Sequence, residues 1–301
     1  MELGRLDTEQ RNPNTMQIDT LSTLEMVSLI NEEDHHCAEA VKQALPEIAR
    51  SVDLIYECIR SGGRLFYVGA GTSGRLGILD ASECPPTYGV SPDLVQGLIA
   101  GGTGAIIKAV EGAEDSRELG RQDLKDRHFS QKDALVGIAA SGRTPYVLGA
   151  MEYARSLGAP VMAMVCTRHS ELSKVADVTM ELLPGPEVVT GSSRMKSGTC
   201  QKMALNMLST CVMIKAGKVY GNLMVDVRAS NEKLYQRCIS IVMAATGLED
   251  REKIVETLET CGWSCKTAIV MLLMGLSRHE AEEALVTHDG RISMVTVQAG
   301  T

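Results

Sequence analysis

The chain has 301 residues and a net charge of -8 at pH 7. That length can hold one sizeable α/β core with a smaller appendage. The acidic balance, without any Lys/Arg run, argues against a nucleic-acid-binding surface. No apolar run is long enough to span a bilayer, and the N-terminal residues do not resemble a signal peptide, so we expect a cytoplasmic protein.

Nine cysteines are scattered along the chain without a C-x-x-C pair. An odd number of scattered cysteines is typical of reduced, mostly buried thiols in a cytosol. Cys261 and Cys265 could be drawn with His279 and His288 as a zinc site. Their spacing is wrong for a zinc knuckle and suits one turn of a helix, so we expect no metal site.

The N-terminal quarter predicts an arm followed by helices. Residues 1–20 are polar, lack periodicity and predict an arm rather than a regular element. Ser22 and Glu25 form a capping box at the start of a short helix. An apolar stripe then predicts a long amphipathic helix from about 33 to 60, which Ser61-Gly62-Gly63 ends.

The middle of the chain alternates between strands and helices. Apolar runs predict five strands, at 64–69, 94–100, 134–139, 160–166 and 177–183. The segments between them predict helices at 74–83, 103–120, 145–157 and 170–176. This alternation predicts an α/β fold in which helices flank both faces of a five-stranded parallel sheet, as in flavodoxin-like proteins.

The remainder of the chain is predicted to be helical. Residues 194–217 are apolar nearly all round and predict a buried helix, in the core or in a subunit contact. Beyond Ala244 the pattern predicts three short helices, at 250–259, 264–274 and 278–286, the last with a capping box at Ser277 and Glu280. The predicted domains are an arm (1–20), an α/β domain (21–245) and a small helical domain (246–301).

A glycine-rich turn follows the first predicted strand, and its glycines fit the pattern G-x-G-x-x-G. A dinucleotide site would also need an acidic residue at the tip of the second strand, where this chain has Gly101. Thr72 and Ser73 instead place hydroxyls at a helix N-terminus, where the helix dipole favours an anion. We interpret Gly71, Thr72 and Ser73 as a cradle for a phosphate monoester.

A second turn of this kind follows the third predicted strand. It contains Ser141, Gly142 and Thr144, and it also opens a helix. Two such turns at the carboxyl ends of neighbouring strands converge on one crevice, so the two together predict a ligand site. A third polar loop, over 190–199, precedes a helix and adds Arg194 and Lys196 as candidate phosphate partners.

Two carboxylates are candidates for acid–base chemistry. Glu83 precedes a Cys-Pro-Pro sequence, and Glu114 lies on or just after the helix predicted to follow the second strand. Two glutamates in different environments can divide acid and base roles. Spacing alone favours solvated acids at helix ends. Cys84 has no histidine in a plausible partner position, so a cysteine nucleophile is not expected.

These motifs together resemble the N-acetylmuramic acid 6-phosphate etherases of the sugar isomerase (SIS) superfamily, over nearly the whole chain. The resemblance is carried by Thr8-Glu9-x-Arg11-Asn12, 69–75, 80–87, 111–115, Ser141-Gly142-Arg143-Thr144-Pro145 and 194–202. The most specific part is Glu83-Cys84-Pro85-Pro86-Thr87 joined to the glycine turn. The Ser141 turn alone would indicate only a SIS domain. Met195 and Cys200 replace the usual Leu and Ala and leave the site residues unchanged.

The resemblance implies a substrate, a mechanism and an assembly. The substrate would be a muramic acid 6-phosphate with an N-acetyl group and a D-lactyl ether at C3, and the products N-acetylglucosamine 6-phosphate and D-lactate. Glu83 would protonate the departing lactate and later activate water, and Glu114 would take the C2 proton. The family resemblance further implies a homodimer, no metal or organic cofactor, and a C-terminal module similar to ubiquitin-associated domains.

Two other functions remain compatible with the same fold. An aldose–ketose isomerase also needs a base beside C2, but gains nothing from an acid at the C3 oxygen. A sugar-phosphate sensor similar to the glucokinase regulatory protein shares the loop motifs. Such regulators duplicate the SIS domain, and transcriptional sensors add a basic DNA-binding helix, so the acidic balance and single predicted unit of this chain disfavour them.

Overall fold

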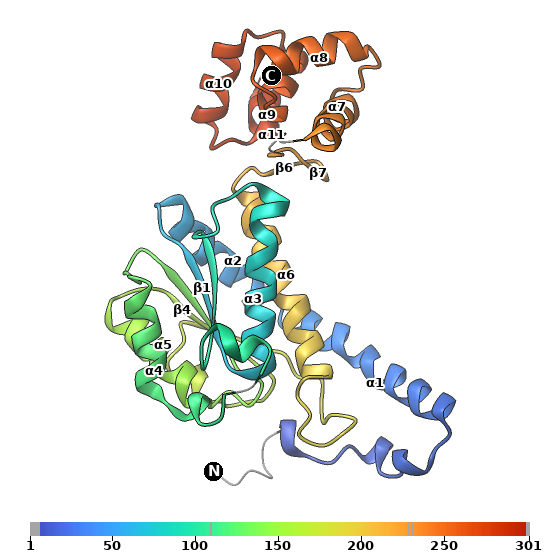
Figure 1. The fold of residues 1–301 in the computed structure, drawn as a ribbon, viewed down its shortest axis with the longest axis vertical. Helices are drawn as coiled ribbons and strands as arrows, with labels where there is room; N and C mark the ends of the chain where they lie inside the picture. Colours follow the sequence, from blue (N-terminus) through green and yellow to red (C-terminus); the bar gives the residue numbers. More distant parts are fainter. Residues whose placement is uncertain (1–6, 109, 228, 230, 299–301) are drawn as a thin grey trace. The chain divides into compact units, whose positions relative to one another are not determined.

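The chain forms two compact units in a computed structural model that describes residues 7–108, 110–227, 229 and 231–298 (Figure 1). The described residues of 1–83 and 92–209 make up the first unit, and those of 84–91 and 210–301 make up the second. The predicted limits of an arm, an α/β domain and a helical domain stay a prediction. Within the described ranges, no helix is long and apolar enough to cross a membrane.

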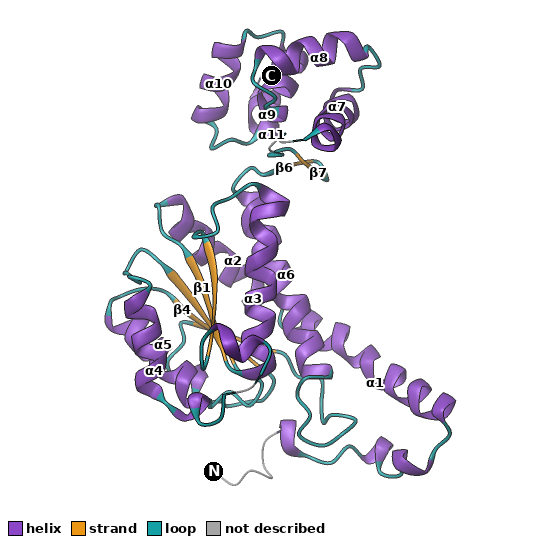
Figure 2. Ribbon diagram, viewed as in Figure 1, coloured by secondary structure: helices purple, strands orange, loops and turns teal. Residues whose placement is uncertain are grey.

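Five parallel strands form the centre of the first unit. They are β1 (Leu65–Gly69), β2 (Val95–Ile99), β3 (Ala134–Ile138), β4 (Val161–Val165) and β5 (Val178–Glu181). Their order is β2-β1-β3-β4-β5, so the chain reverses direction across the sheet between β1 and β3. The predicted sheet is confirmed, and Figure 2 shows its strands among the helices. The carboxyl ends of β1 and β3 thus form the switch point where open α/β sheets bind ligands.

Helices cover this sheet. They are α1 (Thr23–Gln43), α2 (Leu45–Arg60), α3 (Gly71–Tyr88), α4 (Arg117–Asp126), α5 (Pro145–Ser156) and α6 (Lys196–Lys215). Two of them, α3 and α6, contribute residues to both units. The helices predicted at 145–157 and 194–217 are confirmed. Most of α6 is buried, as its apolar sequence predicts, although Cys211 and Ile214 are exposed.

The N-terminal helices divide differently from the prediction. The capping box of Ser22 and Glu25 is present and begins α1. However, α1 continues unbroken to Gln43, and the predicted single helix over 33–60 is interrupted at Ala44. Pro46 explains the break because it lacks the N–H that would continue the hydrogen-bond ladder, while it fits the first turn of α2.

The continuous helices predicted at 103–120 and 170–176 are wrong. Short 3-10 turns replace them: η5 (Thr103–Ile106), η6 (Ala113–Asp115) and η7 (Leu172–Lys174). Regular helix begins only with α4. Gly102 and Gly112 adopt positive φ angles of 71° and 74°, which a right-handed helix does not accommodate.

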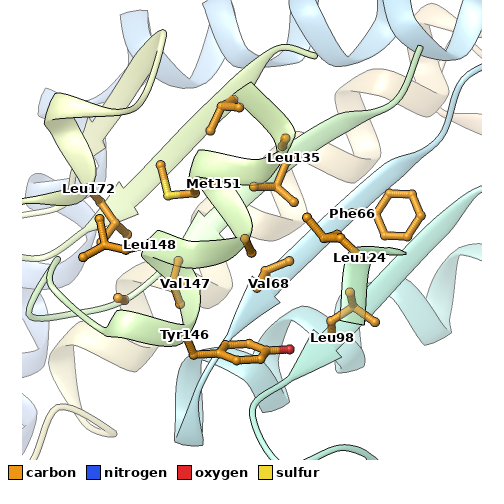
Figure 3. Close-up of a cluster of buried hydrophobic side chains, with 14 of the residues drawn as sticks. Phe66, Val68, Leu98, Leu124, Leu135, Tyr146, Val147, Leu148, Met151 and Leu172 are labelled. Atoms are coloured by element: carbon orange, nitrogen blue, oxygen red, sulfur yellow. The ribbon is translucent and has the colours of Figure 1, made fainter. Parts of the chain in front are cut away.

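A core on one face of the sheet joins β1 and β3 to α4 and α5 (Figure 3). Phe66 packs edge-on against Phe129, with ring centroids 5.2 Å apart. Glycine at position 120 lets α4 and α5 pack closely, since a Cβ on Gly120 would lie only 2.0 Å from the carbonyl oxygen of Tyr146. This contact brings α4 against the first turn of α5.

A buried carboxylate joins α3 to the sheet and to α6. Asp80 is 6% exposed and accepts hydrogen bonds from Tyr67, Asn206 and Ser209, at 3.1, 2.9 and 3.1 Å. Burial raises the pKa of Asp80 above its usual value. These bonds hold α3 and α6 beside β1.

The second unit is helical with one small hairpin. Its elements are β6 (Val219–Tyr220), β7 (Leu223–Met224), α7 (Glu232–Thr246), α8 (Arg251–Thr260), α9 (Cys265–Met274), α10 (Arg278–Thr287) and α11 (Ile292–Gln298). The three predicted short helices are confirmed as α8, α9 and α10, together with the Ser277 capping box. The prediction missed α7 and α11. Apolar side chains of all five helices share one core. Trp263 packs against this core and meets the ring of Tyr235 edge-on, with the ring centroids 4.5 Å apart.

Candidate active site

The glycine turn connects β1 to α3 at the switch point. Because α3 begins at Gly71, the backbone amides of its first turn lack partners within the helix. Gly71 has a φ of +54°. Gly69 and Gly74 serve packing, since a Cβ on Gly69 would lie 2.6 Å from the backbone nitrogen of Gly74. The turn thus presents the positive end of α3 at the edge of the sheet.

A second turn connects β3 to α5 beside it. Gly142 has a φ of +62°, and a Cβ there would lie 2.3 Å from the Cβ of Ser170, so only glycine fits. Thr144 is the N-cap residue of α5, but within the described loop its side chain makes no capping hydrogen bond. The Thr144 hydroxyl is therefore not used to begin the helix, unlike most threonines at this position.

The two turns and the N-terminal arm enclose one pocket of about 250 Å³. It is lined by Thr8, Glu9, Ala70, Gly71, Thr72, Ser73, Glu114, Ala139, Ala140, Ser141, Arg143, Thr144 and Ser193. The lining combines hydroxyls, two helix N-termini, one guanidinium and two carboxylates. Such a set suits a polar, anionic ligand with several oxygen atoms.

Most of the predicted site residues meet at this pocket. The binding residues predicted from the sequence that line it are Gly71, Thr72, Ser73, Ser141 and Thr144. Gly142 lies in the same turn without being one of the lining residues. Glu114 reaches the pocket from η6 and is exposed. The hydroxyl of Ser73 donates to Oε1 of Gln201 on α6 at 2.9 Å, which fixes its orientation.

Glu83 is not one of the described residues that line the pocket. It is exposed and lies on α3 ten residues after Ser73. At 1.5 Å per residue, that separation amounts to about 15 Å along the helix. Among the described residues, Glu114 thus belongs to the lining of this pocket and Glu83 does not.

Lys196 lies outside the pocket as well, in a polar cluster that we call the arm anchor (Asn12, Asn14, Glu33 and Lys196). The side chain of Lys196 is 1% exposed, and its ammonium donates to the carboxylate of Glu33. That carboxylate also accepts from Asn12 at 2.7 Å and from Asn14 at 2.8 Å. Burial by itself would raise the pKa of Glu33, but these three donors outweigh it and hold the pKa below its usual value.

The arm anchor borders a separate pocket of about 430 Å³ and orders the N-terminal arm. The arm forms three 3-10 turns: η2 (Asp7–Glu9), η3 (Pro13–Thr15) and η4 (Ile18–Thr20). Thr15 also donates to the carbonyl of Val188 at 2.9 Å. These contacts place Thr8 and Glu9 in the wall of the smaller pocket. Sequence reasoning missed both as site residues, although the Thr8-Glu9-x-Arg11-Asn12 motif was the signal that could have found them.

Comparisons with known proteins place the fold in one class. The family model of the glucokinase regulatory protein N-terminal SIS domain matches residues 47–155, and that of the SIS domain matches residues 120–211. Phosphoheptose isomerase from Neisseria gonorrhoeae has a similar fold, with a TM-score of 0.51 and 18% sequence identity, covering 64% of this chain and 98% of that one. The sheet and its two turns therefore define a SIS-domain protein.

Two relatives specify the family within that class. N-acetylmuramic acid 6-phosphate etherases from Photorhabdus laumondii and Aliivibrio fischeri are 58% and 59% identical to this chain. Each match covers 97% of this chain and 97% of the relative. The chain belongs to the N-acetylmuramic acid 6-phosphate etherase family, so the resemblance inferred from its motifs is confirmed.

Proposed function

We propose that the protein is a carbon–oxygen lyase that cleaves the D-lactyl ether of N-acetylmuramic acid 6-phosphate, giving N-acetylglucosamine 6-phosphate and D-lactate. This activity follows from its membership of the etherase family. The observation that carries the proposal is the pocket at the switch point, where Glu114 faces hydroxyls and two helix N-termini. The step would serve the recycling of cell-wall amino sugars.

The phosphate of the substrate binds, in this proposal, between the N-termini of α3 and α5. Backbone amides in the first turn of α3 and the hydroxyls of Thr72, Ser141 and Thr144 can surround its oxygens. Ser73 can accept a hydrogen bond while it donates to Gln201. Arg143 adds a positive charge near the same oxygens.

The proposed chemistry begins at C2 of the ring-opened sugar, whose proton is acidic because it lies next to the C1 aldehyde. Glu114 removes this proton, and the electron pair forms the C2–C3 double bond as the C3–oxygen bond breaks. A carboxylic acid protonates the departing lactyl oxygen. Water then adds at C3 and C2 regains a proton, so one water is consumed for each D-lactate released.

Glu83 is the proposed acid for the lactyl oxygen and the later activator of water. Its distance along α3 from the pocket means that a second copy of the chain has to supply it. We therefore propose a homodimer in which the Glu83-bearing face of one copy completes the pocket of the other. The exposed side chains of Leu24 and Val27 on α1, at 75% and 53%, support a further contact surface between copies.

A cytoplasmic location accompanies this function in the proposal. All nine cysteines lie within the described ranges and are thiols rather than disulfides. Seven of them are buried, as is typical of structural thiols in a reducing compartment.

The test is turnover of N-acetylmuramic acid 6-phosphate in deuterated water. We expect D-lactate in solution and one deuterium at C2 of the sugar product. Tight binding of N-acetylglucosamine 6-phosphate without any lactate would contradict the proposal and favour a sensor on the same fold. Aldose–ketose conversion of a substrate without the lactyl group, in place of ether cleavage, would favour an isomerase.

A further inference from the structure

We propose that the N-terminal arm supplies a binding residue to the pocket, and that the hydroxyl of Thr8 hydrogen-bonds to the sugar part of the bound sugar phosphate. The identity of the ligand rests on the proposed function. The contact itself is inferred from the burial of Thr8, from its hydroxyl, which is unpaired within the described part of the chain, and from its place in the pocket wall.

The hydroxyl of Thr8 has an unusual environment. Thr8 is 3% exposed, and its Oγ1 has no hydrogen-bond partner among the described residues. A buried hydroxyl is normally paired, because leaving it unpaired forfeits the bonds it makes in water. Thr8 also lines the pocket that holds Glu114 and Thr144. An oxygen atom of a ligand bound in that pocket would give the Thr8 hydroxyl the hydrogen-bond partner that the described residues do not supply.

The arm anchor holds Thr8 in place before any ligand arrives. Asn12, four residues further on, is 4% exposed and donates to Glu33 at 2.7 Å and to the carbonyl of Pro186 at 3.2 Å. Its own Oδ1 accepts from the backbone N–H of Asn14 at 2.9 Å. A side chain that is already ordered loses little entropy on binding, so a single hydrogen bond from it has a measurable effect on affinity.

The neighbour of Thr8 indicates which part of the ligand it meets. Glu9 lies next to Thr8 and also lines the pocket. A carboxylate repels a phosphate dianion, whereas it accepts hydrogen bonds from sugar hydroxyls or an N-acetyl N–H. The phosphate therefore belongs at the helix N-termini across the pocket. The arm faces the sugar.

The test compares T8V, which removes only the hydroxyl, with T8S, which keeps it. Thr20 provides a matched control, because it is an exposed arm threonine that bonds to the carbonyl of Gln17 and is outside the described lining of the pocket. The probes are N-acetylglucosamine 6-phosphate and inorganic phosphate, each titrated by calorimetry. We expect T8V to weaken binding of the sugar phosphate about tenfold, with no change for inorganic phosphate. T8S and T20V should bind both probes as the wild type does.

Unchanged affinity of T8V for the sugar phosphate would overturn the proposal. So would an equal loss for both probes, which would place the contact at the phosphate, or an equal loss in T8S, which would mean that the methyl group matters. Thermal unfolding of T8V should match the wild type, since the hydroxyl that it loses has no partner among the described residues. Binding is measured without turnover, so failure of the etherase assay would leave this test intact.

Discussion

Two polar clusters share the N-terminal arm, and they differ in how their polar groups are paired. In the arm anchor, the buried ammonium of Lys196 and the carboxylate of Glu33 satisfy each other with help from Asn12 and Asn14. In the pocket, Glu114 is exposed, and the Thr8 hydroxyl is buried without a partner among the described residues. The first arrangement stabilises a fold, and the second suits a ligand.

This difference could not be read from residue types. Lys196 lies in a polar loop-to-helix segment that looks as suitable for phosphate as the Ser141 turn does. Its partner Glu33 is 163 residues away in sequence, so only the folded chain shows that its charge is already neutralised. Whether a polar group has a partner within the protein is thus a better guide to its role than its position in a motif.

The largest expected effect is on catalysis, from Glu114→Gln. Loss of the proposed base should lower kcat for D-lactate release by about 10²–10⁴-fold. The melting temperature should stay near that of the wild type, because Glu114 is exposed. The matched control is Glu111→Gln, an exposed glutamate of the same segment that is outside the described lining of the pocket. A similar loss in both variants would contradict a specific role for Glu114.

The next effect is on stability, from Lys196→Met. The change leaves the carboxylate of Glu33 buried without its cation, which should lower the free energy of unfolding by about 3–5 kcal/mol. Denaturant unfolding measures it, and replacing Glu33 by leucine in the same chain should restore part of the loss. A stable Lys196→Met variant with a raised KM would instead show that Lys196 binds substrate.

A pH profile provides a smaller test of the arm anchor. The pKa of Glu33 is lower in the folded chain, so its contribution to stability is complete above the unfolded-state pKa of about 4.3. It is lost as the pH falls through the folded-state pKa. The difference in unfolding free energy between the wild type and Glu33→Gln should therefore shrink as the pH falls below about 4. A difference that does not vary with pH would rule out an ionised Glu33 as the centre of the cluster.

The smallest effect concerns the glycine turn. Alanine at Gly71 has to adopt a φ of +54°, which should cost about 1–2 kcal/mol of stability. Gly62, with a φ of +82°, is a matched control outside the described lining of the pocket. Both variants should lose similar stability, but only Gly71→Ala should bind N-acetylglucosamine 6-phosphate more weakly. Equal binding by the two variants would argue against a phosphate at this turn.

The sheet and its two turns were predictable because their signals are local. Each strand is a short apolar run, and the hydroxyl-rich turns after β1 and β3 follow directly from it in sequence. The arm was not predictable, because its position depends on contacts with residues far along the chain, such as that of Thr15 with Val188. The length of α3 was also underestimated, since the sequence predicted a helix over 74–83 only. It continues through Pro85 and Pro86 to Tyr88, although prolines usually end a helix.

The most direct test of the proposed mechanism is exchange of the C2 proton of N-acetylglucosamine 6-phosphate in deuterated water, followed by NMR. It probes the first proposed step alone, without release of lactate. The wild type and Glu111→Gln should replace the C2 proton with deuterium, and Glu114→Gln should fail to do so. Exchange by Glu114→Gln at the wild-type rate would contradict the claim that this pocket is where the sugar loses its proton.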